Sequence, residues 1–253
     1  MHVLDNPVWH ALQGPQRILG RATELAGRFD EDVSPFGAIA EGANPDLAWP
    51  VLAQLLGPKG TVELTGDRPG PPTGWTVTSR LEGVQMVAES MPGRQTELGS
   101  ARGRTTESPP LESAPEPSAV KTITPSPIPL GASDVPEMMA LVKVARPGPF
   151  EARTIEFGGY VGIRIDGDLV AMAGERLRPP GYTEISAVAT HPDYRHRGLA
   201  RQVVVSVADN IIRRGDTPIL HALVSNRGAI RLYESLGFTP RRLMTFQCLQ
   251  APG

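Results

Sequence analysis

Hydrophobic side chains in the second half of the chain repeat with the spacing of a buried helix. Between residues 199 and 212, two adjacent apolar rows recur every four positions: Leu199, Val203, Val207 and Ile211, and beside them Ala200, Val204, Ala208 and Ile212. Because the apolar stripe is this wide, we expect the helix to lie against a sheet. Gly215, which comes after Arg213 and Arg214, is typical of the residue just past a helix end.

Apolar runs on either side of this helix predict the strands of that sheet. Residues 160–175 read as two strands joined at Asp166-Gly167, a dipeptide favoured in tight hairpin turns. Further strands are expected at 184–190, 219–224 and 243–248, with additional helices at 134–145 and 226–236. Strands that alternate with helices in this way predict an α/β fold built on a mixed sheet.

Residues 1–98 show weaker patterns and predict a smaller α+β unit. Helical spacing of apolar residues occurs at 18–29 and at 52–56, and short strand-like runs follow at 61–64, 75–78 and 84–88. No arrangement of residues in this part points to a particular chemistry.

The stretch from residue 99 to 126 separates the two parts. It is rich in Pro, Ser, Thr and Glu and contains no aromatic residue. Such a composition buries too little apolar surface to offset the entropy of ordering the backbone. We therefore predict an N-terminal α+β region at 1–98, a semi-extended linker at 99–126 and a C-terminal domain at 127–253.

Net charge and apolar content narrow the classes of partner. The 253 residues include 25 Lys and Arg against 27 Asp and Glu, for a net charge of −2. A nucleic-acid partner would favour a strong basic excess, so none is expected. Apolar runs stay well short of the roughly 18 residues of a membrane span, and the first residues lack the pattern of a secretory signal. We therefore expect no membrane partner and a cytoplasmic location.

Cysteine and histidine positions give no sign of a metal centre. Cys248 is the single cysteine, which excludes an internal disulfide and any multi-cysteine metal site. His10, His191, His196 and His221 are scattered without ligand spacing, and we interpret each as a surface or loop residue. No metal is therefore expected.

The turn before the long helix carries the clearest chemical signal. Residues 195–200 read Arg-His-Arg-Gly-Leu-Ala and lie between a predicted strand and the helix start. The first backbone N–H groups of a helix lack internal partners and carry partial positive charge, so they form a cradle for phosphate. Gly198 permits close approach of a ligand, and Arg195, Arg197 and Arg201 add positive charge. Taken alone, the same residues also fit an ordinary strand-to-helix loop with solvated arginines.

A second motif, a helix that begins at Asn226, carries Tyr233 and ends in Gly237-Phe238, follows this loop along the chain. The pair of motifs resembles the GNAT superfamily of acyl-CoA-dependent N-acetyltransferases over roughly residues 127–246. In the loop, the family pattern is matched by Arg195, Gly198 and Ala200.

The resemblance implies a GNAT-type N-acyltransferase fold for the C-terminal domain. The whole chain is similar to a two-part branch of the superfamily, in which a degenerate GNAT-like half precedes the catalytic half. The sequence departs from the family pattern at His196, where a glycine is commoner. A side chain at this position is expected to narrow the loop without abolishing it.

The resemblance also implies which residues bind acetyl-CoA. Backbone groups of Val188 and Thr190 are expected to pair with the pantetheine arm, and Asn226 and Ala229 to line its other side. A backbone N–H near Val188 or Ala189 is expected to polarise the thioester carbonyl. The pyrophosphate is expected on the N–H groups of Arg195, His196, Arg197, Gly198, Leu199, Ala200 and Arg201.

Two side chains are the candidate catalytic groups. Tyr233 lies one helical turn beyond Ala229 and is expected to protonate the departing thiolate; without the second motif it would fit a core aromatic equally well. Glu184 is the first candidate to accept the proton of the amine, and Glu175 is the second. Either carboxylate also fits an exposed charge at a strand end.

The expected function is transfer of an acetyl group from acetyl-CoA to a primary amine in a ternary complex. The acceptor stays open between a small-molecule amine and a protein amine, and so does the length of the acyl chain. The N-terminal half is expected to cover one side of the acceptor cleft or to form a homodimer contact. The alternative is a non-catalytic module that binds acyl-CoA as a sensor or scaffold.

Overall fold

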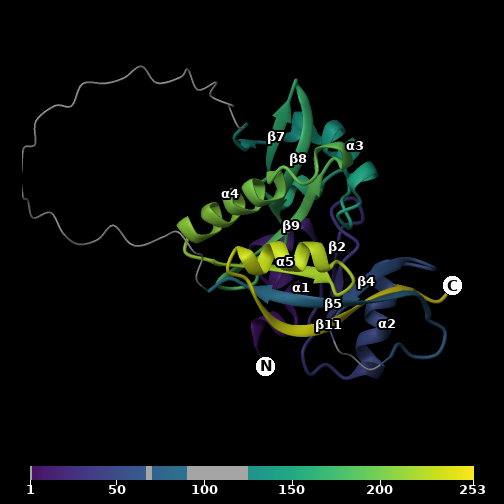
Figure 1. The fold of residues 1–253 in the computed structure, drawn as a ribbon. Coiled ribbons are helices and arrows are strands. Elements are labelled where there is room, and N and C mark those ends of the chain that lie inside the picture. The colour runs from purple at the N-terminus through teal and green to yellow at the C-terminus, as the bar shows by residue number, and fades with distance from the viewer. Residues whose placement is uncertain (1, 67–69, 90–124) are drawn as a thin grey trace, which may run out of the picture.

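The computed structural model describes residues 2–66, 70–89 and 125–253, and its centre is a mixed sheet of eight strands (Figure 1). The strands lie in the order β4 (Thr61–Thr65), β11 (Thr239–Gln250), β5 (Thr76–Val87), β10 (Thr217–Leu223), β9 (Tyr182–Thr190), β8 (Asp168–Glu175), β7 (Val161–Ile165) and β6 (Ile128–Pro129). Among these strands β9 and β10 pair in parallel, and the other neighbours pair antiparallel. The predicted mixed α/β sheet is confirmed.

The helices α4 (Leu199–Arg213) and α5 (Arg227–Ser235) cover one face of this sheet (Figure 1). The two apolar rows predicted for α4 form its buried side, which packs on β7, β8, β9 and β10. Asn226 caps α5, because its Oδ1 accepts a hydrogen bond of 3.2 Å from the N–H of Ala229. The sequence predicted both helices to within about one residue.

The opposite face is covered by α3 (Val135–Ala145) and by the N-terminal part of the chain. That part contains α1 (Pro7–Gln13), α2 (Pro45–Leu56) and a three-stranded sheet of β1 (Gly20–Ala22), β2 (Ala26–Phe29) and β3 (Gly37–Ile39). Its core joins Phe29 and Phe36 to Phe157, Leu177 and Phe246 of the rest of the chain. Short 3-10 helices occur at Val3–Asp5, Pro15–Leu19, Ala132–Asp134, Thr154–Phe157 and Pro192–Tyr194.

The strands β4 and β5 tie the predicted N-terminal region into the central sheet. β5 lies between β10 and β11 and pairs with both, and β4 pairs with the outer edge of β11. Strands from 1–98 and from 127–253 therefore belong to one continuous sheet, although the two parts are separated in the sequence by a stretch of different composition. The expected linker at 99–126 falls outside the described residues except for 125 and 126, and the degenerate GNAT-like character of residues 1–98 stays a prediction.

Two local predictions are wrong. The segment 18–29 forms β1 and β2 instead of a helix, because pairing with β3 buries all four residues of β2. The two strands expected at 75–78 and 84–88 are one strand, β5. It continues through Gly83, where the ring of Phe246 lies so close that a Cβ would meet it at 2.2 Å. Both outcomes depend on contacts between distant segments, which periodicity does not report.

Candidate active site

The strands β9 and β10 separate part of the way along their length. Their parallel pairing runs from Thr217 opposite Tyr182 to Leu220 opposite Ile185 and ends there. β9 continues to Thr190, and β10 continues to Leu223 along β5. The edge of β9 that faces β10 is therefore open over residues 186–190, and a ligand can pair with it there.

A bulge in β9 lies beside this opening. Ala187 has a φ of 52°, and the β8–β9 register shifts between Met172 and Gly174. Past the bulge, the N–H of His191 donates to the carbonyl of Val170 on β8 at 2.8 Å. Because backbone groups alternate along a strand, Ala189 directs its groups to β8, whereas Val188 and Thr190 direct theirs to the open edge.

Thr190 also has a side chain that lacks a partner. Its Oγ1 is buried and makes no hydrogen bond to any residue that the structure describes. A buried hydroxyl without a partner costs free energy, so a group that binds at the open edge and satisfies it would gain that hydrogen bond. Thr190 thus lies on the open edge of β9, and its hydroxyl is an additional polar atom there.

The N-terminus of α4 lies at the end of the loop that follows β9. Its N-cap residue Gly198 has a φ of 75° and supplies no side chain to cap the helix. Within the described residues, the N–H groups of Leu199, Ala200 and Arg201 have no acceptor, and the helical pattern starts with Gln202 N–H donating to Gly198. These three donors are free to bind an anion.

Charged side chains of this loop are exposed around the free donors. Arg195, His196 and Arg201 are exposed, and His196 has a φ of 62°, a conformation that glycine adopts without strain. Arg197 lies over the ring of Tyr194 at 4.9 Å, and Arg201 donates to Ser235 of α5 at 3.3 Å. The loop therefore presents positive charge to solvent next to the helix start.

Tyr233 of α5 packs into the same apolar core as Leu199 and is 7% exposed. Its hydroxyl donates no hydrogen bond to another residue of the described segments, and its ring contacts Phe238 edge to face. Burial raises the pKa of Tyr233 to about 12. The phenol is therefore protonated at neutral pH and has its proton available for a ligand.

Glu184 is placed differently from the expectation of a strand-end base. It is fully buried, Arg176 contacts both of its oxygens at 2.9 and 2.6 Å, and Nδ1 of His221 lies 2.7 Å from Oε1. Burial alone would raise the pKa of Glu184, but Arg176 and His221 together hold that pKa well below its usual range. A carboxylate so firmly ionised is a weak proton acceptor.

Glu175, the second candidate, is also buried, and arginine side chains donate hydrogen bonds to both of its oxygens. Arg214 contacts its two oxygens at 2.7 and 2.8 Å, and Arg178 donates to Oε2 at 3.1 Å. Neither carboxylate is an exposed strand-end charge, so the simpler interpretation is wrong for both.

His221 is the residue that the sequence interpretation missed. It lies on β10 with its side chain 4% exposed, so the expectation of a surface or loop histidine is wrong. Leu220 and Ala222 belong to the core under α4, and alternation along the strand directs His221 to the opposite face. The signal available in the sequence was a polar residue, His221, between two apolar residues of a predicted strand.

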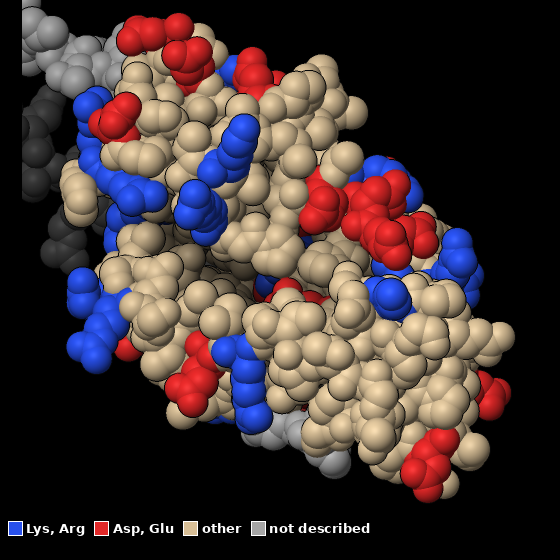
Figure 2. Space-filling view, turned by 90° about the vertical axis from the view of Figure 1, so that its right-hand side faces the viewer, with Lys and Arg blue, Asp and Glu red and all other residues tan. Residues whose placement is uncertain are grey.

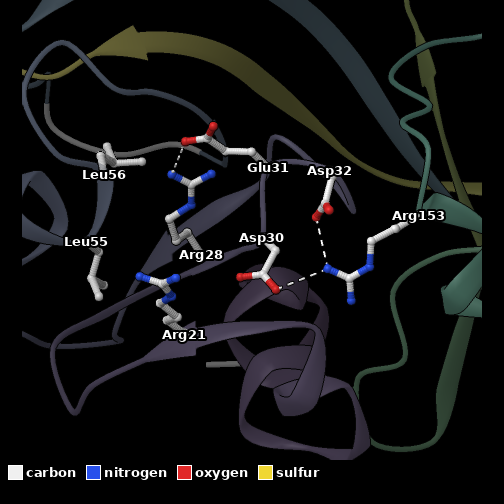
Figure 3. A pocket seen from close by; sticks show the side chains of 8 residues that line it. All are labelled: Arg21, Arg28, Asp30, Glu31, Asp32, Leu55, Leu56 and Arg153. Carbon is white, nitrogen blue, oxygen red and sulfur yellow. Dashed lines mark hydrogen bonds and ion pairs between the residues drawn. The ribbon is translucent and has the colours of Figure 1, made fainter.

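The surface seen from the right-hand side of Figure 1 is hollowed near its centre, and acidic atoms are visible at the floor of the hollow (Figure 2). A separate cavity of about 590 Å³ lies between the N-terminal part and Arg153 of the C-terminal part, and Figure 3 shows the residues that line it. There Arg153 pairs with Asp30 at 3.5 Å and with Asp32 at 3.0 Å. None of the predicted site residues lines this cavity.

Neither a membrane-spanning helix nor a cluster of metal ligands occurs in the part of the chain that the structure describes. No helix there is long and apolar enough to cross a membrane. Likewise, residues 2–66, 70–89 and 125–253 contain no group of three or more His, Cys, Asp or Glu arranged to hold a metal ion.

Comparison with known proteins identifies relatives of the C-terminal part. Residues 160–246 match the family described as FR47-like protein. The chain is 37% identical over 82 residues to the N-alpha-acetyltransferase RimI of Mycobacterium tuberculosis, a match that covers 31% of this chain and about half, 51%, of that relative. It is 31% identical over 117 residues to the [ribosomal protein bS18]-alanine N-acetyltransferase of Salmonella typhimurium, covering 43% of this chain and 77% of that enzyme.

Solved structures resemble the chain over its full length. A crystal structure of an acetyltransferase from the GNAT family of Novosphingobium aromaticivorans superimposes with a TM-score of 0.79 at 39% identity and covers 100% of both chains. A GCN5-related N-acetyltransferase from Kribbella flavida shares the fold, with a TM-score of 0.59 at 21% identity over 97% of this chain and 94% of that one. The fold that these structures share with this chain therefore includes its N-terminal part.

Proposed function

The chain belongs to the GNAT family of acetyltransferases, and on this premise we propose that it transfers an acetyl group from acetyl-CoA to a primary amine by direct attack in a ternary complex. One observation carries the proposal: the uncapped N-terminus of α4 is joined by a short loop to the strand whose edge is open over residues 186–190. A diphosphate and the amide-containing arm attached to it need these two features side by side.

The residues of this region fit acetyl-CoA, the acyl donor, in two places. Backbone N–H groups at the start of α4 would hold the pyrophosphate, with Arg195, Arg197 and Arg201 adding positive charge. Val188 and Thr190 would pair with the pantetheine arm through their free backbone groups. Acetyl-CoA itself supplies an activated thioester.

The remaining predicted roles follow from the same placement. Val188, whose N–H is directed to the open edge, is better placed than Ala189 to polarise the thioester carbonyl. Asn226 uses Oδ1 to cap α5, which leaves its amide N–H groups free for the arm, and Ala229 follows on the first turn. Tyr233 would donate its phenolic proton to the leaving thiolate.

The acceptor is proposed to be a primary amine, and a protein α-amino group is the first candidate. Relatives from Salmonella and Escherichia coli are named for the alanine of ribosomal protein bS18, and the relative from Mycobacterium tuberculosis is named an N-alpha-acetyltransferase. The hollow of Figure 2, with acidic atoms at its floor, would suit entry of a cationic amine. Small-molecule amines are the second class to test.

The experiment measures thiol release from acetyl-CoA in the presence of a panel of amines and alanine-initiated peptides. Amine-dependent release that falls by about a hundredfold or more in Tyr233→Phe supports the proposal, because general acid catalysis contributes about 10²–10⁴. Because burial raises the pKa of Tyr233 to about 12, loss of its proton should not lower the wild-type rate at or below pH 10.

A non-catalytic acyl-CoA sensor gives a different result. It would bind CoA tightly and release no thiol with any amine, and Tyr233→Phe would then leave CoA binding unchanged. That outcome would contradict the proposed transferase while retaining the proposed ligand.

A further inference from the structure

His221 occupies the point at which the two parallel strands separate. Leu220 is the last residue of β10 that pairs with β9, and His221 is the next residue along. Its side chain lies on the face opposite α4, in edge contact with the ring of Phe246 at 6.0 Å. The imidazole therefore belongs to the first residue of β10 beyond its pairing with β9, and it lies buried on the side of the sheet away from the helix that would hold the pyrophosphate.

The hydrogen bonds around Gln85 determine which ring nitrogen of His221 carries the proton. Arg241 has only donors and lies 2.7 Å from Oε1 of Gln85, so Nε2 of Gln85 is the amide donor. That nitrogen donates to the carbonyl of Leu4 at 3.0 Å and lies 2.9 Å from Nε2 of His221. Nε2 of His221 must therefore accept, and the imidazole is the neutral form with hydrogen on Nδ1.

Glu184 fixes the other side of the ring. Nδ1–H of His221 donates to Oε1 of Glu184 at 2.7 Å, and Arg176 holds the same carboxylate through two hydrogen bonds. The arrangement resembles other carboxylate–imidazole pairs, in which an ionised acid orients the ring and stabilises the imidazolium when Nε2 takes a proton.

The charges that face the imidazole nearly cancel. Glu184 on β9 is paired with Arg176, and Arg241 on β11 reaches the ring only through Gln85. Glu63 on β4 interacts electrostatically with Arg176 and Glu184 from the neighbouring side. The charged group in direct contact with the ring is the carboxylate of Glu184.

We propose that His221 is the group that accepts the proton of the acceptor amine, with Glu184 as its positioning residue. The inference rests on the proposed function and replaces the expectation that Glu184 is itself the base. The amine takes the place of the Gln85 amide at Nε2, so the Gln85 side chain has to move away from His221 and give up its hydrogen bond to Leu4.

An N–H bond of the ammonium breaks, its electron pair stays on nitrogen and the proton moves to Nε2 of His221. The new C–N bond forms as the C–S bond of the thioester breaks, and the thiolate takes the proton of Tyr233. The nitrogen of the new amide loses its second proton to the phenolate of Tyr233, and the imidazolium loses its proton to solvent, which restores both residues.

The test compares His221→Gln with the wild-type chain on one amine at a series of pH values. We expect kcat to fall by about a hundredfold or more while the dissociation constant for CoA stays within twofold, because the base contributes about 10²–10⁴. At low pH, the dependence of kcat on pH should also differ between the variant and the wild-type chain. His10→Gln, which alters a distant histidine on α1, is the matched control and should leave the rate unchanged.

A second variant covers a failure of His221→Gln to fold. His221→Ala leaves a space for free imidazole, and added imidazole should restore part of its rate, whereas it should not stimulate Tyr233→Phe. Glu184→Gln should lower kcat and shift the pH profile, as expected of a positioning residue.

The inference is overturned if folded His221 variants keep the wild-type kcat and pH profile, or if imidazole gives no rescue of a folded, inactive His221→Ala. A wild-type chain that releases no thiol with any amine would instead defeat the proposed function. The two failures are therefore distinguishable.

Discussion

Neighbouring arginine side chains determine whether the buried carboxylates of Glu184 and Glu175 can act as bases. Glu184 and Glu175 were both expected near strand ends, and both are there. Arg176 and Arg214, which the sequence places after β8 and after α4, turn them into buried ion pairs. Position along a strand was therefore predictable from the sequence, whereas the protonation behaviour depended on partners that only the fold brings together.

Thr190 and Thr183 offer a matched pair on β9. Oγ1 of Thr190 is buried without a partner, whereas Oγ1 of Thr183 donates to Asp216 at 2.7 Å. We predict that Thr190→Val raises the unfolding free energy by about 1 kcal/mol, because an unsatisfied buried hydroxyl is removed. Thr183→Val should lower it by about 1 kcal/mol or more, because Asp216 loses its donor.

Denaturant unfolding and calorimetric titration with CoA check both threonine variants. Thr190→Val should weaken CoA binding, and Thr183→Val should not. A destabilised Thr190→Val chain would contradict the account, since it would mean that the hydroxyl already has a partner in the free protein.

At the scale of elements, strongly periodic segments were predictable. The helix α4, the Asp166-Gly167 hairpin and the cap at Asn226 all follow local rules, and both turn residues have the positive φ that the hairpin requires. The strand pair at 20–29 was missed because it depends on β3, which lies further along the chain. The separation of β9 from β10 has no local signal either, because strand pairing is set by the whole sheet.

The two ends of α4 are chemically different but structurally comparable. Gly198 before it and Gly215 after it have φ values of 75° and 90°, and at both positions a Cβ would meet no atom within 4 Å. A side chain at either position therefore introduces backbone strain without a clash. Only the N-terminal end presents free N–H groups, so the two glycines separate strain from anion binding.

At the scale of the whole molecule, strand pairing and ion pairs both join the N-terminal part to the central sheet. Beyond β4 and β5, Asp5 accepts hydrogen bonds from Arg241 at 2.7 Å and Arg242 at 3.0 Å on β11. Partial burial opposes ionisation of Asp5, but these arginines and the N–H of His2 lower its pKa to about 2. The domain boundaries predicted from composition could not reveal these ion pairs, because Asp5 and its arginine partners are at opposite ends of the chain.

We predict that Asp5→Asn lowers the unfolding free energy at pH 7 by about 2 kcal/mol, since each unit of pKa shift corresponds to about 1.36 kcal/mol. The folded-state pKa is lowered, so this contribution is present above the ordinary value of 3.8 and is lost as the pH falls to about 2. Urea unfolding of both chains between pH 7 and pH 2 measures it, with exposed Asp168→Asn as the control. A gap that does not narrow with falling pH would show that Asp5 is not held as an ion by Arg241 and Arg242.

The most direct test of the phosphate site is the dissociation constant for CoA of Gly198→Ala and of Gly215→Ala, measured by calorimetry. Both variants should lose a similar amount of stability, about 1 kcal/mol, from the same backbone strain. We predict that Gly198→Ala weakens CoA binding about tenfold and that Gly215→Ala leaves it within twofold of the wild-type value. Equal effects in the two variants, or unchanged binding in Gly198→Ala, would contradict the assignment of the α4 N-terminus as the site that holds the pyrophosphate.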